Sequence, residues 1–212
     1  MTNRVAVLIS GSGTNLQALI DHSQRAECTA EIAVVVSNRA NVRGLERARD
    51  AGIDAVWIDH RGKARAAYDR ELVDRLKQSE VDWVFLAGFM RLLSPVFLDA
   101  FPGRVINIHP ALLPSFPGLN AQQQAFDAGV QVSGATVHFV DSGMDTGAII
   151  AQGSIRREPA DTMDAFSSRI LAMEHRLFPM VMQWATEGRL ALRDGAAVVD
   201  LAEGESRVLA AE

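Results

Sequence analysis

The stretch VAVLISGSGTN, residues 5–15, decides the fold of this chain. Its first five residues are a continuous apolar run, which is typical of a strand buried on both faces of a parallel sheet. Residues 11–15, GSGTN, supply a tight turn, and a helical pattern of apolar residues follows directly, from residue 16 to 25. A strand that turns through glycine into a helix opens a β–α–β unit. The sequence therefore predicts an α/β protein.

The same alternation continues through the first half of the chain. Right-handed crossovers between parallel strands place the intervening helices on both faces of the sheet. We therefore expect a doubly wound, mostly parallel α/β sheet with a Rossmann-like N-terminal half, in which ligands bind beyond the carboxyl ends of the strands. Further strands are predicted at residues 32–37, 55–59, 83–87 and 105–108, and helices at residues 43–51, 65–78 and from Pro95.

The second half of the chain changes to an antiparallel pattern. Two apolar strands flank a glycine-containing loop and predict an antiparallel hairpin joined to the main sheet. A short helix precedes this hairpin, and a long helix begins near Thr162 after it. Pro179 lies inside the long helix and should kink it or split it in two. The two strands are expected at residues 134–140 and 148–155, and the short helix at residues 121–128.

The end of the chain carries a second hairpin signal. Apolar residues on either side of Asp194-Gly195 predict a small hairpin, and the last ten residues are mostly small or acidic and should fray. No linker or low-complexity tract divides the chain. We therefore expect one domain over residues 1–193, followed by a hairpin strand and a frayed tail over residues 194–212.

Composition excludes several classes of protein. The chain has 212 residues, a formal net charge of −5 and one cysteine, so we expect no nucleic-acid partner, no internal disulfide and a reducing, cytoplasmic location. Its apolar runs are too short to span a bilayer. Of its 21 basic residues only Lys63 and Lys77 are lysines, and neither lies in a glycine-rich loop. A bound phosphate would therefore be held by backbone N–H groups or by arginine.

The GSGTN turn of residues 11–15 is a candidate phosphate site. Small residues let the backbone approach a ligand, and the first N–H groups of the following helix face an anion. The dinucleotide fingerprint requires a third glycine where this chain has Leu16, and no acidic residue ends the second strand. The turn therefore favours a single phosphate over NAD, with a simple helix cap as the alternative.

Asn107 and His109, at the end of the fifth strand, are a candidate catalytic pair. Residues two apart in a strand point to the same face, and an amide beside an imidazole can polarise a carbonyl group and move a proton. A proline-rich loop follows at residues 110–118, with Leu113–Pro114 expected as a cis bond. The other histidines are interpreted as exposed or hydrogen-bonded structural residues: His22, His60, His138 and His175.

Two further loops could complete a site. Residues 141–147 carry Asp141 and Asp145, but their spacing lacks the oxygen ligands of a calcium loop. These acidic residues form the hairpin turn, or one of them orients His109 and favours its charged form. Residues 88–93, GFMRLL, pack on the core or form the floor beneath a flat heteroaromatic ligand.

Seven segments together resemble the family of folate-dependent phosphoribosylglycinamide (glycinamide ribonucleotide) formyltransferases. The segment NIHPALLPSFPG, residues 107–118, is similar to that of related formyl-transferring enzymes, but its combination with the segments that precede it is specific. The resemblance covers the chain from about residue 5 to residue 193. The other segments are VLISGSGTNLQA (7–18), SNRANVRGLERAR (37–49), AYDREL (67–72), LAGFMRLLSP (86–95), GATVHFVDSGMDTG (134–147) and Glu174-His175.

The resemblance implies an enzyme that moves a formyl group from 10-formyltetrahydrofolate to the amine of glycinamide ribonucleotide in purine biosynthesis, without a metal or NAD. The substrate amine is then the nucleophile, so no Ser, Cys or Lys nucleophile is required. By motif, Asn107, His109 and Asp145 form the catalytic group, in which Asn107 and protonated His109 stabilise a tetrahedral oxyanion. The ribonucleotide would contact Gly13, Thr14, Asn15, Gly88 and Glu174.

The resemblance also implies a folate site. The pterin would lie between two loops, close to Asn107, and the tail of the folate would lie near Arg65. The chain departs from the family at Asn120 and Gln122, where histidines are usual, and at Leu171, where a polar residue is expected. The residues around the pterin would be Met90, Arg91, Leu92, Leu93, Val140, Asp141, Ser142, Gly143 and Met144.

Three alternatives are distinguishable. A methionyl-tRNA formyltransferase or a formyltetrahydrofolate deformylase would carry an additional domain, for which we expect no room in 212 residues. A nicotinamide oxidoreductase is disfavoured by Leu16. A non-catalytic phosphate-binding or nucleotide-binding module would leave Asn107, His109 and Asp145 apart in space. The expected partners are small-molecule substrates only, with neither nucleic acid nor membrane, and the expected state is a monomer or a weak homodimer.

Overall fold

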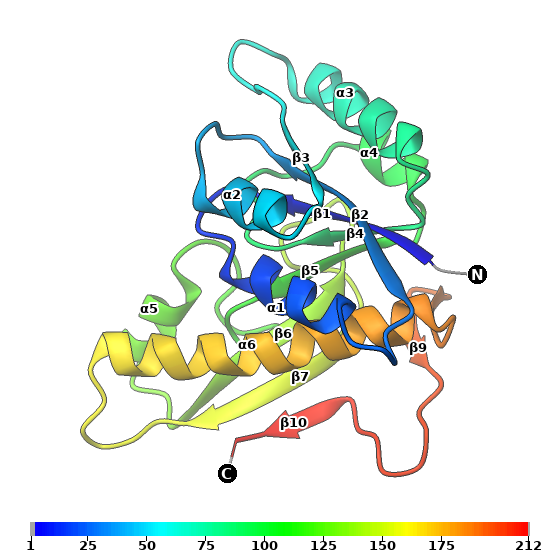
Figure 1. Cartoon of the computed structure of the whole chain (residues 1–212). Coiled ribbons are helices and arrows are strands. Elements are labelled where there is room, and N and C mark those ends of the chain that lie inside the picture. Colours follow the sequence, from blue (N-terminus) through cyan, green and yellow to red (C-terminus); the bar gives the residue numbers. More distant parts are fainter. Residues whose placement is uncertain (1–2, 212) are drawn as a thin grey trace.

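A computed structural model of the chain, which describes residues 3–211, has one large sheet at its centre (Figure 1). The strand order is β10-β7-β6-β5-β4-β1-β2-β3. The first five strands in sequence run parallel to one another, which confirms the doubly wound, mostly parallel sheet predicted from the sequence. They are β1 (Asn3–Ile9), β2 (Ala30–Ser37), β3 (Asp54–Trp57), β4 (Trp83–Leu86) and β5 (Val105–His109).

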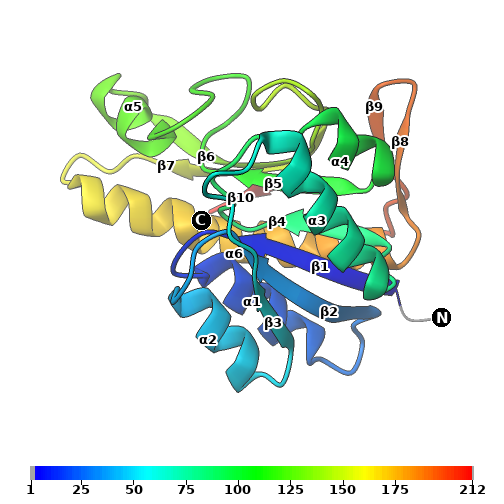
Figure 2. The ribbon, with the colours of Figure 1, turned by 90° about the horizontal axis from the view of Figure 1, so that it is seen from above.

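Helices cover both faces of the sheet because the strands are apolar on both faces. On β1, Val5, Val7 and Ile9 pack on one side, and Ala6 and Leu8 pack on the other. Figure 2 shows the two layers of helices with the sheet between them. The first side is covered by α1 (Thr14–Ser23), α2 (Arg43–Asp50) and α6 (Met163–Thr186), and the second by α3 (Arg65–Gln78) and α4 (Pro95–Ala100).

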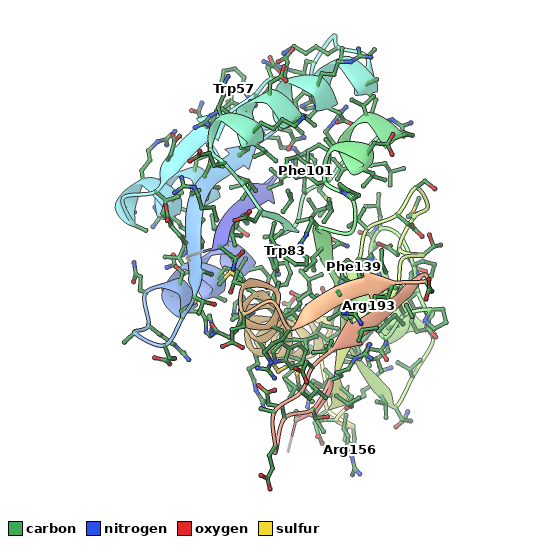
Figure 3. All side chains as sticks on the ribbon, turned by 90° about the vertical axis from the view of Figure 1, so that its right-hand side faces the viewer. Trp57, Trp83, Phe101, Phe139, Arg156 and Arg193 are labelled. Atoms are coloured by element: carbon green, nitrogen blue, oxygen red, sulfur yellow. The ribbon has the colours of Figure 1, made fainter. Side chains whose placement is uncertain are left out.

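Burial falls toward the edge of the sheet. Trp83, on the central strand β4, is 1% exposed and lies beneath the guanidinium of Arg104, 4.4 Å from its ring. Trp57, at the end of the edge strand β3, is 44% exposed, and the two tryptophans are labelled in Figure 3. The interior of the protein is therefore built around β1, β4 and β5, the strands whose ends carry the predicted site.

The predicted antiparallel hairpin joins the sheet beside β5. Its strands are β6 (Val132–Phe139) and β7 (Ile149–Arg156), and the short helix α5 (Ala121–Asp127) precedes them. Since β6 is also antiparallel to β5, Asn107 lies directly opposite His138. The Leu113–Pro114 bond is cis, as expected.

The long helix α6 passes through Pro179 without a break. Its first turn is capped by Thr162, whose hydroxyl accepts a hydrogen bond from the Ala165 N–H at 3.2 Å. The prediction that Pro179 splits the helix is wrong, because the turns on both sides of it, which include Phe178 and Val181, are buried in the core. Burial of those turns offsets the hydrogen bond that proline cannot make. Among the described residues, no helix is long and apolar enough to cross a membrane.

The C-terminal segment departs from the prediction. The small hairpin is present as β8 (Leu190–Arg193) and β9 (Ala196–Val199). The prediction that the last ten residues fray is wrong for β10 (Val208–Ala210), which pairs parallel to β7. The guanidinium of Arg207 donates hydrogen bonds to two backbone carbonyls of β7, each at 2.6 Å. These bonds satisfy backbone carbonyls of β7. Amino-acid composition alone, on which the prediction of fraying was based, does not indicate such pairing. The domain boundary at residue 193 stays a prediction.

Candidate active site

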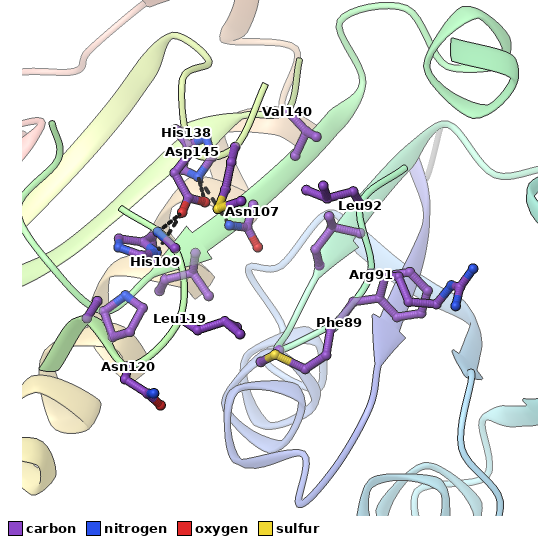
Figure 4. Close-up of a pocket in the computed structure, with 18 of the residues that line it drawn as sticks. Phe89, Arg91, Leu92, Asn107, His109, Leu119, Asn120, His138, Val140 and Asp145 are labelled. Atoms are coloured by element: carbon purple, nitrogen blue, oxygen red, sulfur yellow. Dashed lines mark hydrogen bonds and ion pairs between the residues drawn. The ribbon is translucent and has the colours of Figure 1, made fainter. Parts of the chain in front are cut away.

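A cavity of about 680 Å³ opens at the carboxyl ends of β4 and β5 (Figure 4). This volume lies within the range of small-molecule sites. Its walls are the loop after β4, the loop after β5 and the turn between β6 and β7, which are three of the segments that the sequence singled out. The predicted site residues that line it are Gly88, Met90, Arg91, Leu92, Leu93, Asn107, His109, Val140, Asp141, Gly143, Met144 and Asp145.

The structure brings the three predicted catalytic residues together in this cavity. His109 is buried, and its Nδ1 lies 3.4 Å from Oδ2 of Asp145. Its Nε2 lies 2.8 Å from the backbone carbonyl oxygen of Phe116. Both ring nitrogens therefore face oxygen acceptors, and only the imidazolium form can donate to both. For Nε2 to serve a reacting oxygen, its bond to the Phe116 carbonyl must be exchanged.

Asp145 and Asp141 have different partners, which agrees with the resemblance that assigns only Asp145 to the catalytic group. Asp145 accepts a hydrogen bond from the Gly118 N–H at 2.7 Å through the same Oδ2 that faces His109. Asp141 instead accepts bonds from the Gly143 N–H at 3.0 Å and from the Thr146 hydroxyl at 2.7 Å. Asp141 therefore shapes its own turn, whereas Asp145 joins that turn to the loop after β5 and faces the imidazole.

His138 is a site residue that the sequence interpretation missed. Its Nε2 lies 3.1 Å from Nδ2 of Asn107 and 3.7 Å from Oδ1 of Asp145. The only sequence signal was its place in an apolar strand beside an acidic turn. Its position opposite Asn107 depends on the register between β5 and β6, which the sequence does not specify. The cluster therefore has four members rather than three.

One part of the cavity wall is apolar. Met90, Leu92 and Met144 line this part, and each of them is half exposed or more. The side chain of Arg91 turns away from the cluster, and its guanidinium carbon lies 4.8 Å from the centre of the Tyr68 ring (Figure 4). Exposed thioether and aliphatic groups offer a surface on which a flat ring can pack. Any contact of Arg91 with a ligand in this arrangement would come from its backbone.

Two predicted folate residues lie outside the cavity lining. Arg65 is exposed at the start of α3, and Ser142 is exposed in the turn after β6. The structure does not bring either side chain into the walls described above. A role for Arg65 at the tail of an extended ligand stays a prediction.

The GSGTN turn lies beside the cavity, at the end of β1. Gly13 has φ 71°, and a Cβ atom on it would lie 2.6 Å from the Cα atom of Gly44, so only glycine fits. No side chain caps α1, so no side-chain oxygen satisfies the first N–H groups of the helix. Arg47, which the sequence interpretation also missed, donates to the Ser12 carbonyl at 3.0 Å. This arrangement of backbone N–H groups beside an arginine suits an anion.

A buried hydroxyl connects the turn to the cavity. The Ser10 hydroxyl donates to Oδ1 of Asn38 at 2.6 Å and accepts from the Met90 N–H at 2.8 Å. Ser10 therefore ties the start of the GSGTN turn to the loop after β4. The two candidate binding regions form neighbouring parts of one edge of the sheet.

Asn15 and Glu174, both predicted to contact a ribonucleotide, contact each other. Nδ2 of Asn15 donates to Oε2 of Glu174 at 3.1 Å. Glu174 is 5% exposed, and this burial raises the pKa of its carboxyl group to about 7, although the hydrogen bond from Asn15 opposes the shift. The predicted ribonucleotide residues outside the lining of the large cavity are Gly13, Thr14, Asn15 and Glu174. They would therefore contact a different part of the bound substrates from the part that fills the cavity.

We expect the Glu174→Gln variant to be more stable than the parent protein above pH 7. The folded-state pKa of Glu174 lies above its ordinary value of 4.5, so the associated stability is present below pH 4.5 and is lost as the pH rises through 7. A shift of this size corresponds to a loss of about 3 kcal/mol at pH 8, which a neutral amide avoids.

Urea unfolding of both proteins at pH 4.5 and pH 8 measures this effect. The advantage of the Glu174→Gln variant should grow between the two pH values. The exposed residue Glu203 provides a control, because Glu203→Gln should show no such growth. An equal difference at both pH values would mean that Glu174 is ionised at no cost in the folded protein.

The chemistry of the site is that of an amide, two imidazoles and a carboxylate. Among residues 3–211, no group of three or more His, Cys, Asp and Glu side chains could hold a metal ion. A doubly wound sheet with such a cluster in a cavity at its carboxyl edge, beside a turn that suits an anion, is typical of an α/β enzyme of small-molecule metabolism.

Comparison with known proteins identifies the family. The profile described as "Formyl transferase" matches residues 3–182, and the chain belongs to the formyl transferase family. The phosphoribosylglycinamide formyltransferase of Escherichia coli K12 is 42% identical over 197 residues, which are 92% of this chain and 93% of that protein.

Two further relatives extend the comparison. The crystal structure of glycinamide ribonucleotide transformylase 1 from Symbiobacterium toebii is 48% identical and superposes with a TM-score of 0.90, over 93% of this chain and 94% of that one. The trifunctional purine biosynthetic protein adenosine-3 of Drosophila pseudoobscura is 50% identical over 190 residues. These are 88% of this chain but only 14% of that protein, so the chain matches one part of a much longer relative.

Proposed function

We propose that this protein is a phosphoribosylglycinamide formyltransferase, which transfers the formyl group of 10-formyltetrahydrofolate to the amine of 5-phosphoribosylglycinamide in purine biosynthesis. The observation that carries the proposal is the cluster of Asn107, His109 and Asp145 in a cavity that adjoins an anion-binding turn. The similarity to bacterial phosphoribosylglycinamide formyltransferases over nearly the full length of both proteins supports it.

The mechanism follows from the donors in the cavity. The substrate amine attacks the formyl carbon, and negative charge develops on the formyl oxygen. Asn107 and the His109 imidazolium donate hydrogen bonds to that oxygen, while Asp145 balances the charge of the imidazolium. A proton then passes from the attacking amine to N10 of the folate, which is the leaving group, through water. No nucleophilic side chain is needed at any step.

The two regions of the site divide the substrates between them. The apolar wall formed by Met90, Leu92 and Met144 suits the pterin ring, and the cavity volume of about 680 Å³ accommodates it. The backbone N–H groups of the GSGTN turn suit the phosphate, and Glu174 suits the ribose hydroxyls. The cytoplasmic location and the monomeric or weakly dimeric state stay predictions.

A formyl-transfer assay with two acceptors tests the proposal. With 10-formyltetrahydrofolate as donor, the protein should formylate 5-phosphoribosylglycinamide far faster than glycinamide, which has the same amine but no phosphate. The difference should appear mainly in KM, because the phosphate contacts are made before the reaction. Equal rates with both acceptors would contradict the phosphate site, and release of formate without formylated product would indicate a hydrolase.

A further inference from the structure

We infer that His138, as a neutral imidazole, is a positioning residue that fixes the orientation of the Asn107 amide. This inference rests on the proposed function, because it assigns His138 a task in stabilising the formyl oxygen. The two residues face each other across antiparallel strands, Asn107 on β5 and His138 on β6. His138 is 2% exposed, so its ring nitrogens are paired mainly with protein atoms.

The tautomer of His138 follows from its backbone partner. Its Nδ1 lies 2.8 Å from the carbonyl oxygen of Phe139, and a carbonyl oxygen only accepts hydrogen bonds. Nδ1 therefore carries the proton. In the neutral ring, Nε2 then has a free lone pair and acts as an acceptor. Burial favours this neutral form, since it lowers the pKa of His138 below its ordinary value.

The acceptor at Nε2 fixes the amide of Asn107. The side-chain atom of Asn107 that lies 3.1 Å from Nε2 must be a donor, so it is the amide nitrogen. A flipped amide would bring its oxygen against the lone pair of Nε2. One N–H of the amide is thus used by His138, and the second is held at a fixed angle over the cavity. In Figure 4 the amide oxygen lies on the side away from His138.

Protonation of His138 would reverse this arrangement. A proton on Nε2 would turn the ring nitrogen into a donor, and Oδ1 of Asp145, at 3.7 Å, is the nearest carboxylate that could accept it. The charged groups that face the ring are Asp145 and Asp141 from the turn after β6 and His109 from β5. A charged His138 would therefore compete with His109 for Asp145 and would repel the N–H of Asn107.

A double-mutant cycle tests whether His138 acts through Asn107. The His138→Phe variant removes the acceptor and keeps a ring of similar size, and we expect kcat for formyl transfer to fall about 10- to 100-fold, with much smaller changes in the KM values. The same substitution in the Asn107→Ala protein should lower kcat by no more than about twofold further, because there is no amide left to orient. Full multiplication of the two losses would overturn the inference.

A rescue variant separates orientation from packing. The His138→Gln variant offers an amide oxygen as an acceptor, and we expect it to recover most of the kcat that His138→Phe loses. If both variants are equally impaired, the ring has a structural role only. Thermal unfolding of each variant shows whether the protein is folded before the rates are compared.

A measurement on the unmodified protein keeps the test decisive if the variants fail to fold. In the 15N spectrum of histidine-labelled protein at pH 7.5, His138 should show a protonated Nδ1 and an unprotonated Nε2. A protonated Nε2 would overturn the inference. Absence of formyl transfer by the unmodified protein would instead contradict the proposed function, so the two failures are distinguishable.

Discussion

Replacing Asn107 with alanine should lower kcat for formyl transfer about 100- to 1000-fold, the effect of removing one preorganised oxyanion donor. The Asn107 amide is held by Nε2 of His138 at 3.1 Å, so the donor needs no reorganisation as charge develops on the formyl oxygen. His109→Ala should lower kcat by the same factor or by a larger one, because it removes the second donor. Steady-state kinetics with both substrates varied separates the effect on kcat from that on KM.

Gln122 provides a matched control for the loss of an amide. It lines the same cavity from α5, and no hydrogen bond of its side chain is found among the described residues. Gln122→Ala should therefore change kcat by less than about tenfold, well below the loss expected for an oxyanion donor. If Asn107→Ala and Gln122→Ala are equally active, Asn107 contributes nothing specific to the transition state, and the oxyanion would have to be stabilised elsewhere.

The parallel half of the fold is predictable because its strands carry their own burial pattern. The apolar run that ends at Ile9 is buried on both faces, and the glycines after it permit the tight turn into α1. Each such unit is local, so the sequence indicates both the strand and the helix that follows. The position of the site follows from the same pattern, since loops at the carboxyl ends of parallel strands meet at one edge.

Pairings between distant segments could not be predicted in the same way. The pairing of β10 with β7 depends on backbone bonds between residues more than fifty positions apart, to which the Arg207 side chain adds bonds to β7 carbonyls. The task assigned to His138 depends on the register of β6 against β5. Arg91 was assigned to the ligand by its place in the chain, but its side chain lies over Tyr68 on α3. None of these partners has a fixed spacing in the sequence.

Asp145→Asn should lower kcat at least about 100-fold, within the range for groups that take part in proton transfer or stabilise a proton donor. The carboxylate of Asp145 lies 3.4 Å from Nδ1 of His109 and holds the Gly118 N–H at 2.7 Å. An asparagine can still accept the bond from Gly118 through its amide oxygen, so the loop after β5 should keep its path. The variant therefore removes the negative charge beside the imidazole and little else.

Comparison with two further variants shows what that charge does. Asp145→Ala also frees the Gly118 N–H, so it should be no more active than Asp145→Asn. Asp141→Asn removes a charge from the same turn, but the Asp141 carboxylate accepts bonds from its own loop at Gly143 and Thr146 rather than facing His109. Its kcat should be at least about tenfold higher than that of Asp145→Asn.

The ranking of these variants decides between two tasks for Asp145. Near-full activity of Asp145→Asn together with low activity of Asp145→Ala would mean that the residue only holds the loop through Gly118. In that case His109 would not need a counter-charge, and Asn107 would be the main donor to the oxyanion. A large loss in both variants means that the charged imidazolium is the catalytic form. The bond from His109 to the Phe116 carbonyl is then the one that must be exchanged when the formyl group arrives.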